Sequence, residues 1–160
     1  MYSRILVPLE HSAYDAAILD HVRHLARHTG ASLVLMHVAD GFAARNVSPL
    51  MLRESEEIRD DREYLERMCE ELEGEGFTAD CVLAGGDPAR EICEAAERER
   101  CDLIAMSTHG HRFLKDLLYG SVAESVRHRS LVPVLLVRGM PDGSPNPTPL
   151  RGVPVVPPPA

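Results

Sequence analysis

The stretch MSTHGHRFLKDLLYGSV, residues 106–122, decides the fold. It begins at the end of the unbroken apolar run Leu103–Met106, which predicts a strand buried on both faces of a parallel sheet. The chain then turns at Gly110, and after nine more residues Gly120-Ser121 stands where a helix should begin. Exposed N–H groups at a glycine turn and the positive end of a helix dipole both favour an anion. The stretch therefore predicts a phosphate cradle at the carboxyl end of this strand.

Outward from this stretch, apolar runs and helical patterns alternate along the chain. The predicted strands cover residues 4–8, 33–38, 77–83, 103–106 and 131–137. The main helices between them are expected to begin near Ser12, Ser48, Pro88 and Gly120, and Gly85-Gly86 is interpreted as a turn. Strands alternating with helices predict an α/β fold with an open parallel sheet and right-handed crossovers.

The glycine pattern resembles a known family. Gly110, nine residues, Gly120-Ser121 and a following apolar strand resemble the universal stress protein motif Gly-x2-Gly-x9-Gly-Ser/Thr, with Ser107 at the first glycine position. The resemblance covers about residues 3–138. It implies a Rossmann-like, adenine nucleotide alpha hydrolase-like sheet of strand order 3-2-1-4-5, with helices on both faces. We therefore expect a universal stress protein domain at residues 1–138 and an extended or disordered tail at 139–160, which holds eight prolines.

The same resemblance implies where an adenine nucleotide binds. Glu10 stands where the family has an aspartate that touches the adenosine, and Val38 would lend its backbone to the adenine. ATP is the expected ligand if the pocket is open, with Mg²⁺ bound to the nucleotide and no metal ligand from a protein side chain. The expected nucleotide-binding residues are Pro8, Leu9, Glu10, Val38, Met106, Ser107, His109, Gly110, His111, Arg112, Gly120, Ser121 and Val122.

Several charged or aromatic residues near this site have two interpretations. His109, His111, Arg112 and Lys115 could contact phosphates, but they could equally be ordinary loop residues. We interpret His37 as a histidine satisfied inside the sheet rather than as a catalytic one.

The last predicted strand is apolar throughout although it should lie at an edge of the sheet. Such an edge invites pairing with another chain. The resemblance implies antiparallel pairing with its twin in a homodimer, and a covering C-terminal tail is the alternative. The residues of this dimer strand are Val132, Pro133, Val134, Leu135, Leu136 and Val137.

Composition narrows the function. The formal charge of −8 argues against nucleic-acid binding. No apolar run is long enough to span a bilayer and the chain opens directly into a strand, so we expect a cytoplasmic protein with no membrane partner. The four cysteines form no Cys-x-x-Cys pair and are interpreted as structural thiols.

Two hypotheses of function remain open. The first is a small ATP-binding regulatory dimer of the stress response with an unknown protein partner. The sequence shows no activated nucleophile or strong metal-ligand spacing, so an enzyme is not expected beyond slow ATP hydrolysis. The second is a dimeric interaction module that binds no nucleotide. Three departures at the pocket favour it: Ser107, Glu10 and Phe113.

Overall fold

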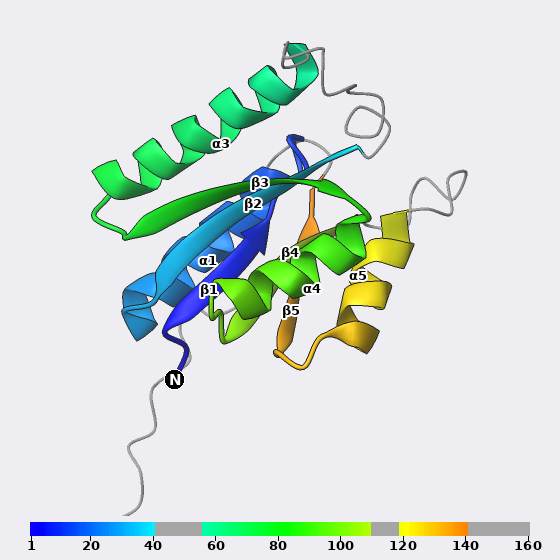
Figure 1. Cartoon of the computed structure of the whole chain (residues 1–160). Coiled ribbons are helices and arrows are strands. Elements are labelled where there is room, and N and C mark those ends of the chain that lie inside the picture. Colours follow the sequence, from blue (N-terminus) through cyan, green and yellow to red (C-terminus); the bar gives the residue numbers. More distant parts are fainter. Residues whose placement is uncertain (41–55, 110–118, 141–160) are drawn as a thin grey trace, which may run out of the picture.

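The computed structural model describes residues 1–40, 56–109 and 119–140. Its elements are β1 (Arg4–Pro8), α1 (Asp15–Thr29), β2 (Ser32–Asp40), α3 (Glu56–Gly74), β3 (Ala79–Gly86), α4 (Pro88–Arg98), β4 (Leu103–His109), α5 (Tyr119–Arg129) and β5 (Val134–Gly139). Within these ranges the strands form one parallel sheet in the order β3-β2-β1-β4-β5 (Figure 1). The predicted α/β fold and the strand order that the family resemblance implied are both confirmed.

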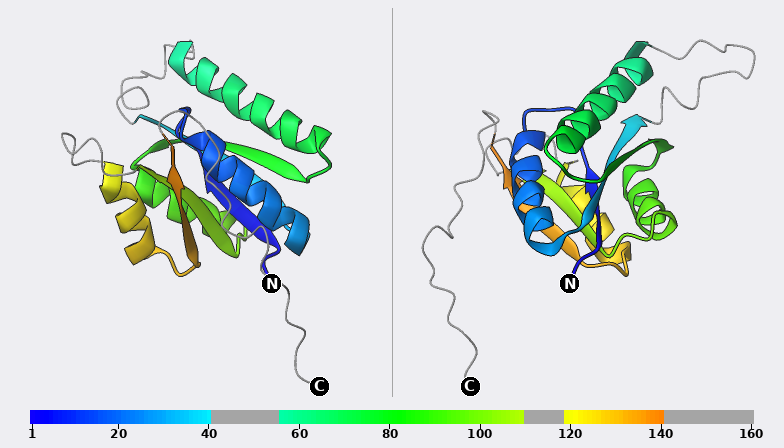
Figure 2. Two further views of the ribbon diagram at one scale, coloured as in Figure 1. Left: turned by 180° about the vertical axis from the view of Figure 1, so that it is seen from behind. Right: turned by 90° about the vertical axis from the view of Figure 1, so that its left-hand side faces the viewer.

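Helices cover both faces of the sheet, with α1 and α3 on one side and α4 and α5 on the other (Figure 2). Successive strand residues point to opposite faces, which divides the core into two layers. In β1, Ile5 and Val7 pack with α1 and α3, whereas Leu6 packs with α4 and α5. All three side chains have no exposed surface, as expected for a central strand that is covered on both faces.

Four of the five strands extend beyond their predicted carboxyl ends, β4 and β3 the furthest. β4 continues to His109, three residues past the apolar run. Gly85 and Gly86 are the last residues of β3, where they pair with Ala39 and Asp40, so their interpretation as a turn was wrong. The helix that follows does begin at Pro88 with the Asp87 carboxylate as its N-cap, as the sequence predicts. The expected helix start at Ser48 lies outside the described residues.

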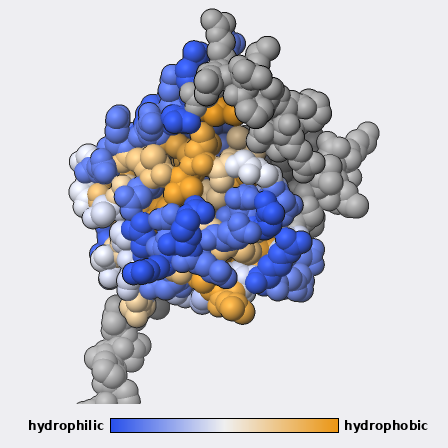
Figure 3. Space-filling view, in the orientation of Figure 1, coloured by the Kyte–Doolittle hydropathy of each residue, from blue (hydrophilic) through white to orange (hydrophobic). Residues whose placement is uncertain are grey.

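The two edge strands are β3 and β5. β5 begins at Val134 rather than at residue 131, so Val132 and Pro133 of the expected dimer strand lie before it. The carbonyl of Pro133 still accepts a hydrogen bond from the Ile104 amide, but Leu131 is 95% exposed. At the other edge strand, β3, the side chains of Val82, Leu83 and Ala84 are only partly buried. Figure 3 shows that the face of the molecule seen in Figure 1 has apolar surface between hydrophilic regions.

None of the helices in the described part of the chain has both the length and the apolar character that a membrane-spanning helix requires.

Candidate functional site

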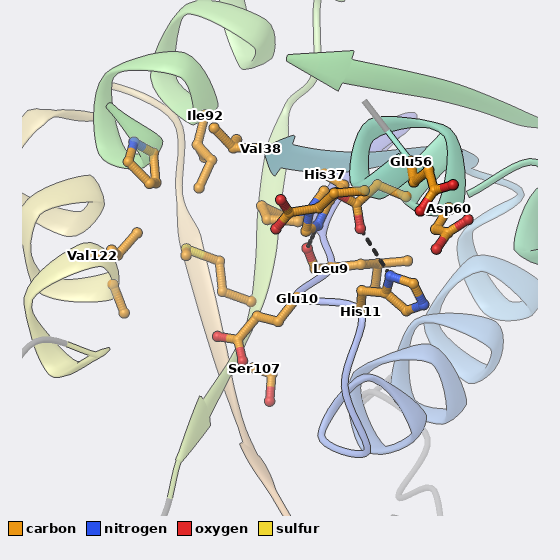
Figure 4. Close-up of a pocket in the computed structure, with 16 residues that line it drawn as sticks. Leu9, Glu10, His11, His37, Val38, Glu56, Asp60, Ile92, Ser107 and Val122 are labelled. Carbon is orange, nitrogen blue, oxygen red and sulfur yellow. Dashed lines mark hydrogen bonds and ion pairs between the residues drawn. The ribbon is translucent and has the colours of Figure 1, made fainter. Parts of the chain in front are cut away.

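A cavity of about 730 Å³ opens where β1, β2 and β4 reach their carboxyl ends (Figure 4). Parallel α/β sheets bind their ligands at the carboxyl ends of the strands, at the point where the strand order reverses. In this sheet that point lies between β1 and β4. The volume lies in the range of small-molecule sites. The cavity is therefore the candidate functional site.

Seven of the expected nucleotide-binding residues line this cavity. They are Pro8, Leu9, Glu10, Val38, Met106, Ser107 and Val122. Gly120 and Ser121 lie in the first turn of α5, directly before Val122, and His109 is the last residue of β4. Gly110, His111 and Arg112 lie outside the described residues, as do Phe113 and Lys115.

The cavity has nine further lining residues that the sequence did not predict as part of the site. The α3 wall consists of Glu56, Glu57, Asp60 and Asp61, with His11 from the loop and His37 from β2 beside it. The other three are Pro88, Ile92 and Ala123, from α4 and α5 on the opposite face of the sheet. The run of charges over residues 53–67 is, by sequence alone, typical of a solvated helix face. A signal was present, because Asp61 stands four residues before buried Leu65 and therefore on the buried stripe of the helix.

Asp61 connects α3 to the two histidines of the cavity. This residue is only 8% exposed, and its Oδ1 lies 2.9 Å from Nδ1 of His11. Its Oδ2 lies 3.3 Å from Nε2 of His37. The other ring nitrogen of His37, Nδ1, donates to the Leu9 carbonyl at 2.9 Å, since a carbonyl oxygen can only accept. His37 therefore has partners on both sides, which agrees with its interpretation as a satisfied histidine, although it also lines the cavity.

The loop from Leu9 to Ser12 is fixed by a second buried carboxylate, Asp15. This carboxylate accepts hydrogen bonds from the Glu10 amide at 2.9 Å, the Ser12 amide at 3.0 Å and the Tyr64 hydroxyl at 2.8 Å. The helix was expected to begin near Ser12, but α1 begins at Asp15. The expected contact between the two residues is present, because the Asp15 carboxylate accepts a hydrogen bond from the Ser12 amide. Burial and the neighbouring Asp15 carboxylate raise the pKa of Tyr64 well above its ordinary value, so the phenol remains a hydrogen-bond donor.

His11 lies within this loop in an unusual backbone conformation. Its φ of 57° falls in the left-handed region, which non-glycine residues seldom adopt. The ring stacks on Tyr64 of α3 with 4.1 Å between centroids and 16° between the planes. The stacking on Tyr64 and the bond to Asp61 hold His11 in this conformation. Both partners belong to α3, so the shape of the loop that lines the cavity depends on that helix.

Glu10 extends from this loop toward the β4 side of the cavity, where Ser107 lies (Figure 4). Partial removal from water and the negative charge of Asp15 raise the pKa of Glu10 to about 7, while His37 acts in the opposite direction. Water still reaches the carboxyl through the open cavity, because Glu10 is an exposed residue. Its protonation therefore responds to whatever fills that opening.

Ser107, at the position of the first motif glycine, turns its hydroxyl to the protein. The Oγ donates to the Tyr14 carbonyl at 3.4 Å, and the residue is 8% exposed. Packing here is tight, because a Cβ added to Gly139 would lie 2.7 Å from Ser107 Oγ and 2.7 Å from Tyr14 Cδ1. The serine is thus accommodated on the α1 side of β4, in contact with β5.

Comparison with known proteins adds to this geometry. The model of the universal stress protein family matches residues 1–138. Universal stress protein MJ0577 of Methanocaldococcus jannaschii is 32% identical, with 86% of this chain and 96% of that protein aligned. Universal stress protein YxiE of Bacillus subtilis is 30% identical over 86% of this chain and its whole own length.

Solved structures of universal stress proteins share the fold of this chain. The structure of MJ0577 superposes with a TM-score of 0.73 over 88% of this chain and 98% of its own. A universal stress protein from Archaeoglobus fulgidus in complex with dAMP is 20% identical and superposes with a TM-score of 0.63 over 85% of this chain and 98% of its own. At that identity the likeness shows the shared fold alone.

Proposed function

The chain belongs to the universal stress protein family, and we propose that it binds an adenine nucleotide, ATP with Mg²⁺ in the first instance, in the cavity at the carboxyl ends of β1, β2 and β4. The observation that carries this proposal is the convergence of seven expected residues, from three strands, the loop after β1 and α5, on one cavity of about 730 Å³. A nucleotide-sized ligand needs a space of this order.

The chemistry of the lining suits the two parts of a nucleotide. Val38, Ile92, Met106 and Val122 offer apolar surface for a purine ring. α5 begins at Tyr119, three residues before Val122, and the N–H groups in the first turn of a helix and its dipole favour a phosphate. The dAMP complex of the Archaeoglobus fulgidus protein supports the adenine part of the proposal, since that protein shares the fold.

Mg²⁺ in this proposal accompanies the phosphates of the nucleotide. Among the described residues, no group of three or more histidine, cysteine, aspartate or glutamate side chains is arranged to hold a metal ion. Phosphate oxygens and water are ligands that Mg²⁺ commonly uses, so the ion needs no protein cage. Its role would be to reduce the negative charge that enters the cavity.

The remaining parts of the proposal concern the whole protein. We propose that residues 1–138 form the binding domain and that the chain acts as a cytoplasmic regulatory homodimer. Half-buried Val134 and Leu135 and 42% exposed Leu136 lie on edge strand β5, which could pair with its twin. Sedimentation of the intact chain tests this assembly. Catalysis beyond slow ATP hydrolysis is not part of the proposal.

The alternative is a dimeric interaction module of the same fold that binds no nucleotide. Two observations favour it. Ser107 replaces the first motif glycine and directs its hydroxyl to Tyr14. In addition, Glu56, Glu57 and Asp60 add negative charge to the cavity wall, which disfavours an anion.

Thermal unfolding with increasing ATP and Mg²⁺ separates the two functions. A ligand that binds only the folded state raises its stability by about 2.7 kcal/mol at a hundredfold excess over Kd. We expect the unfolding temperature to rise with ATP concentration in the natural protein and to stay constant in Gly120→Val, whose side chain fills the predicted cradle. Gly74→Val is the matched control, because a Cβ at Gly74 meets no atom within 4 Å. No shift at millimolar ATP, and no nucleotide retained on purification, would leave the alternative.

A further inference from the structure

We propose that Cys69 and Cys81 form a site of reversible oxidation: a hydroperoxide oxidises exposed Cys81, and buried Cys69 then closes a disulfide that joins α3 to β3. Both residues are free thiols in the structure. The reaction needs no nucleotide, so this inference and the proposed function succeed or fail separately.

The fold brings these two cysteines to the same level of α3 and β3. α3 lies over β3 (Figures 1 and 2). The chain reverses directly after α3 ends at Gly74, where the Phe77 amide donates to the Leu72 carbonyl at 3.0 Å. Cys69 lies five residues before the end of α3, and Cys81 is the third residue of β3. At about 1.5 Å per helical residue and about 3.3 Å per strand residue, each lies roughly 7 Å from the reversal.

Both side chains point into the layer between the helix and the sheet. Cys69 follows Leu65 on the buried stripe of α3 and is 7% exposed. Cys81 stands between Ala79 and Leu83 in β3, and these two residues pack in the core layer that contains Cys69. Because alternate residues of a strand face the same side, Cys81 faces α3 as well. Its sulfur accepts a hydrogen bond from the Cys69 thiol, so the two sulfur atoms are neighbours before any bond forms.

The two thiols differ in their access to an oxidant. Cys81 is exposed and belongs to an edge strand of the sheet. Cys69 is enclosed, and its burial, followed by the charge of a neighbouring Cys81 thiolate, raises its pKa to about 12. Since the thiolate is the form that attacks peroxides, Cys69 is protected from direct oxidation. Cys81 therefore reacts first and Cys69 second.

The bonds and electrons of the reaction balance with a hydroperoxide as the oxidant. The Cys81 sulfur attacks the terminal oxygen, the O–O bond breaks, and a sulfenic acid forms while an alcohol, or water from hydrogen peroxide, leaves with the thiol proton. The Cys69 sulfur then attacks the Cys81 sulfur, the S–O bond breaks, and the hydroxide leaves as water with the Cys69 proton. The two thiols lose two electrons, which the peroxide gains. A neutral sulfenic acid at Cys81 no longer raises the pKa of Cys69 by its charge, which favours this second step.

The disulfide would hold α3, and with it one wall of the cavity, against the sheet. Asp61, which bonds to His11, lies on the same buried stripe of α3 as Cys69. In the cytoplasm, where we propose that the chain works, thiols are kept reduced. The bond should therefore form while peroxide is in excess and open again when reductant prevails.

Peptide mapping of the intact chain after treatment with hydrogen peroxide tests the proposal. With free thiols blocked by iodoacetamide, trypsin leaves both cysteines in one peptide, residues 68–90, and glutamyl endopeptidase cuts between them. We expect this peptide to escape alkylation, to be lighter than the reduced peptide by two hydrogen atoms and to stay joined after the second cleavage. The bond closes a loop of about a dozen residues, so the unfolding temperature should rise by about 5 °C and return with dithiothreitol.

Three variants separate the roles of the cysteines. Cys81→Ser removes the thiol that reacts first and should abolish the crosslink and the temperature rise. Cys69→Ala keeps the exposed thiol and should leave Cys81 as a sulfenic acid, which dimedone traps. Cys93→Ser is the matched control, because it changes a partly buried cysteine in the core layer on the other face of the sheet and should keep the full response.

Three results would overturn the proposal. The first is a peroxide-treated chain in which both thiols of peptide 68–90 remain open to alkylation. The second is Cys81 found mainly as a sulfinic acid or in a disulfide with a second copy of the chain, because Cys69 would then not have closed the bond. The third is an equal rise in unfolding temperature in the natural protein and in Cys81→Ser. Nucleotide binding is measured separately, by unfolding of the reduced protein with ATP.

Discussion

The strands of the sheet have polar networks of opposite character at their two ends. We call these ends the amino edge and the carboxyl edge, as distinct from the edge strands β3 and β5. At the amino edge, the Arg4 guanidinium lies 2.8 Å from the Asp80 carboxylate and donates to the Glu99 carbonyl at 2.9 Å. The amides of Ser3 and Arg4 donate to Asp102 at 2.7 and 3.0 Å. At the carboxyl edge, by contrast, Glu10 and Asp15 lie together, and carboxylates of α3 line the other side of the cavity. Opposite charges meet at one edge and like charges gather at the other.

The difference separates stabilising groups from binding groups. A network in which each charged group faces an opposite charge or a hydrogen-bond donor of the protein is complete as it stands and contributes to folding. A network that keeps an excess of one sign around a cavity is complete only when a proton, a metal ion or a ligand joins it. The carboxyl edge fits the second description, with one exception: Asp15 is fully hydrogen-bonded and should contribute to stability as the amino edge does.

The largest expected effect is the loss of Asp15. Asp15→Ala removes the acceptor of three donors that hold the cavity loop against α3. We expect the free energy of unfolding to fall by about 3 kcal/mol, because hydrogen bonds to a charged group are strong and the donors lose their partner. Urea unfolding followed by circular dichroism measures it.

Tyr64→Phe is the graded control for this substitution. It removes one donor of the three and keeps the ring that stacks on His11. The expected loss is about 1 kcal/mol. Equal losses in the two variants would show that the bond from the Tyr64 hydroxyl accounts for the whole contribution of Asp15 and that the two loop amides add nothing.

The sequence revealed the half of the cavity that local patterns encode. Apolar runs located β1, β2 and β4, and ligands bind where such strands end, which places Val38 at the site, whereas Glu10 was expected there from the family resemblance. The α3 wall was missed because it depends on a contact between Asp61 and His11, 50 residues apart. Within α3, the spacing of Asp61 from Leu65 indicates that its side chain is buried, but only the packing of the helix over the loop shows that it contacts His11.

Errors at the strand ends have the same origin. Gly85-Gly86 indicates a turn when only neighbouring residues are considered. The partner strand decides otherwise, because β2 runs to Asp40 and offers ladder positions opposite both glycines. The strand order likewise came from the family resemblance, since periodicity contains no information on which strands are neighbours.

A moderate effect is expected at the amino edge. Asp102→Ala removes the acceptor of the Ser3 and Arg4 amides, which lie near the chain terminus and remain accessible to water. We expect a loss of about 1 kcal/mol at pH 7. Partial burial raises the pKa of Asp102, but the backbone hydrogen bonds outweigh it and hold the pKa below its ordinary value of 3.8.

The pH dependence of this variant has a definite sign. A lowered pKa in the folded state means that the unfolded chain takes up its proton first as the pH falls. The contribution of Asp102 is therefore complete above its ordinary pKa and is lost as the pH falls through the folded value. The difference between the natural protein and Asp102→Ala should be constant from pH 5 to 8, as about one unit above that pKa suffices, and should shrink below pH 4. A difference that grows in acid would contradict this account.

The smallest effect is expected for Glu75→Gln, also at the amino edge. Glu75 joins Arg23 and Arg27 of α1 at 2.9 and 3.0 Å, and its side chain is 35% exposed. Because water and salt screen such pairs, we expect a loss of no more than about 0.5 kcal/mol, and a smaller one in 1 M salt. Asp15→Ala measured under the same two salt conditions provides the contrast, since buried hydrogen bonds respond little to ionic strength. Two results would contradict this account: an equal loss of unfolding free energy in Glu75→Gln and Asp15→Ala, or an equal effect of salt on the two losses. Either result would mean that burial does not distinguish the two edges. The excess negative charge at the cavity would then no longer indicate a binding site.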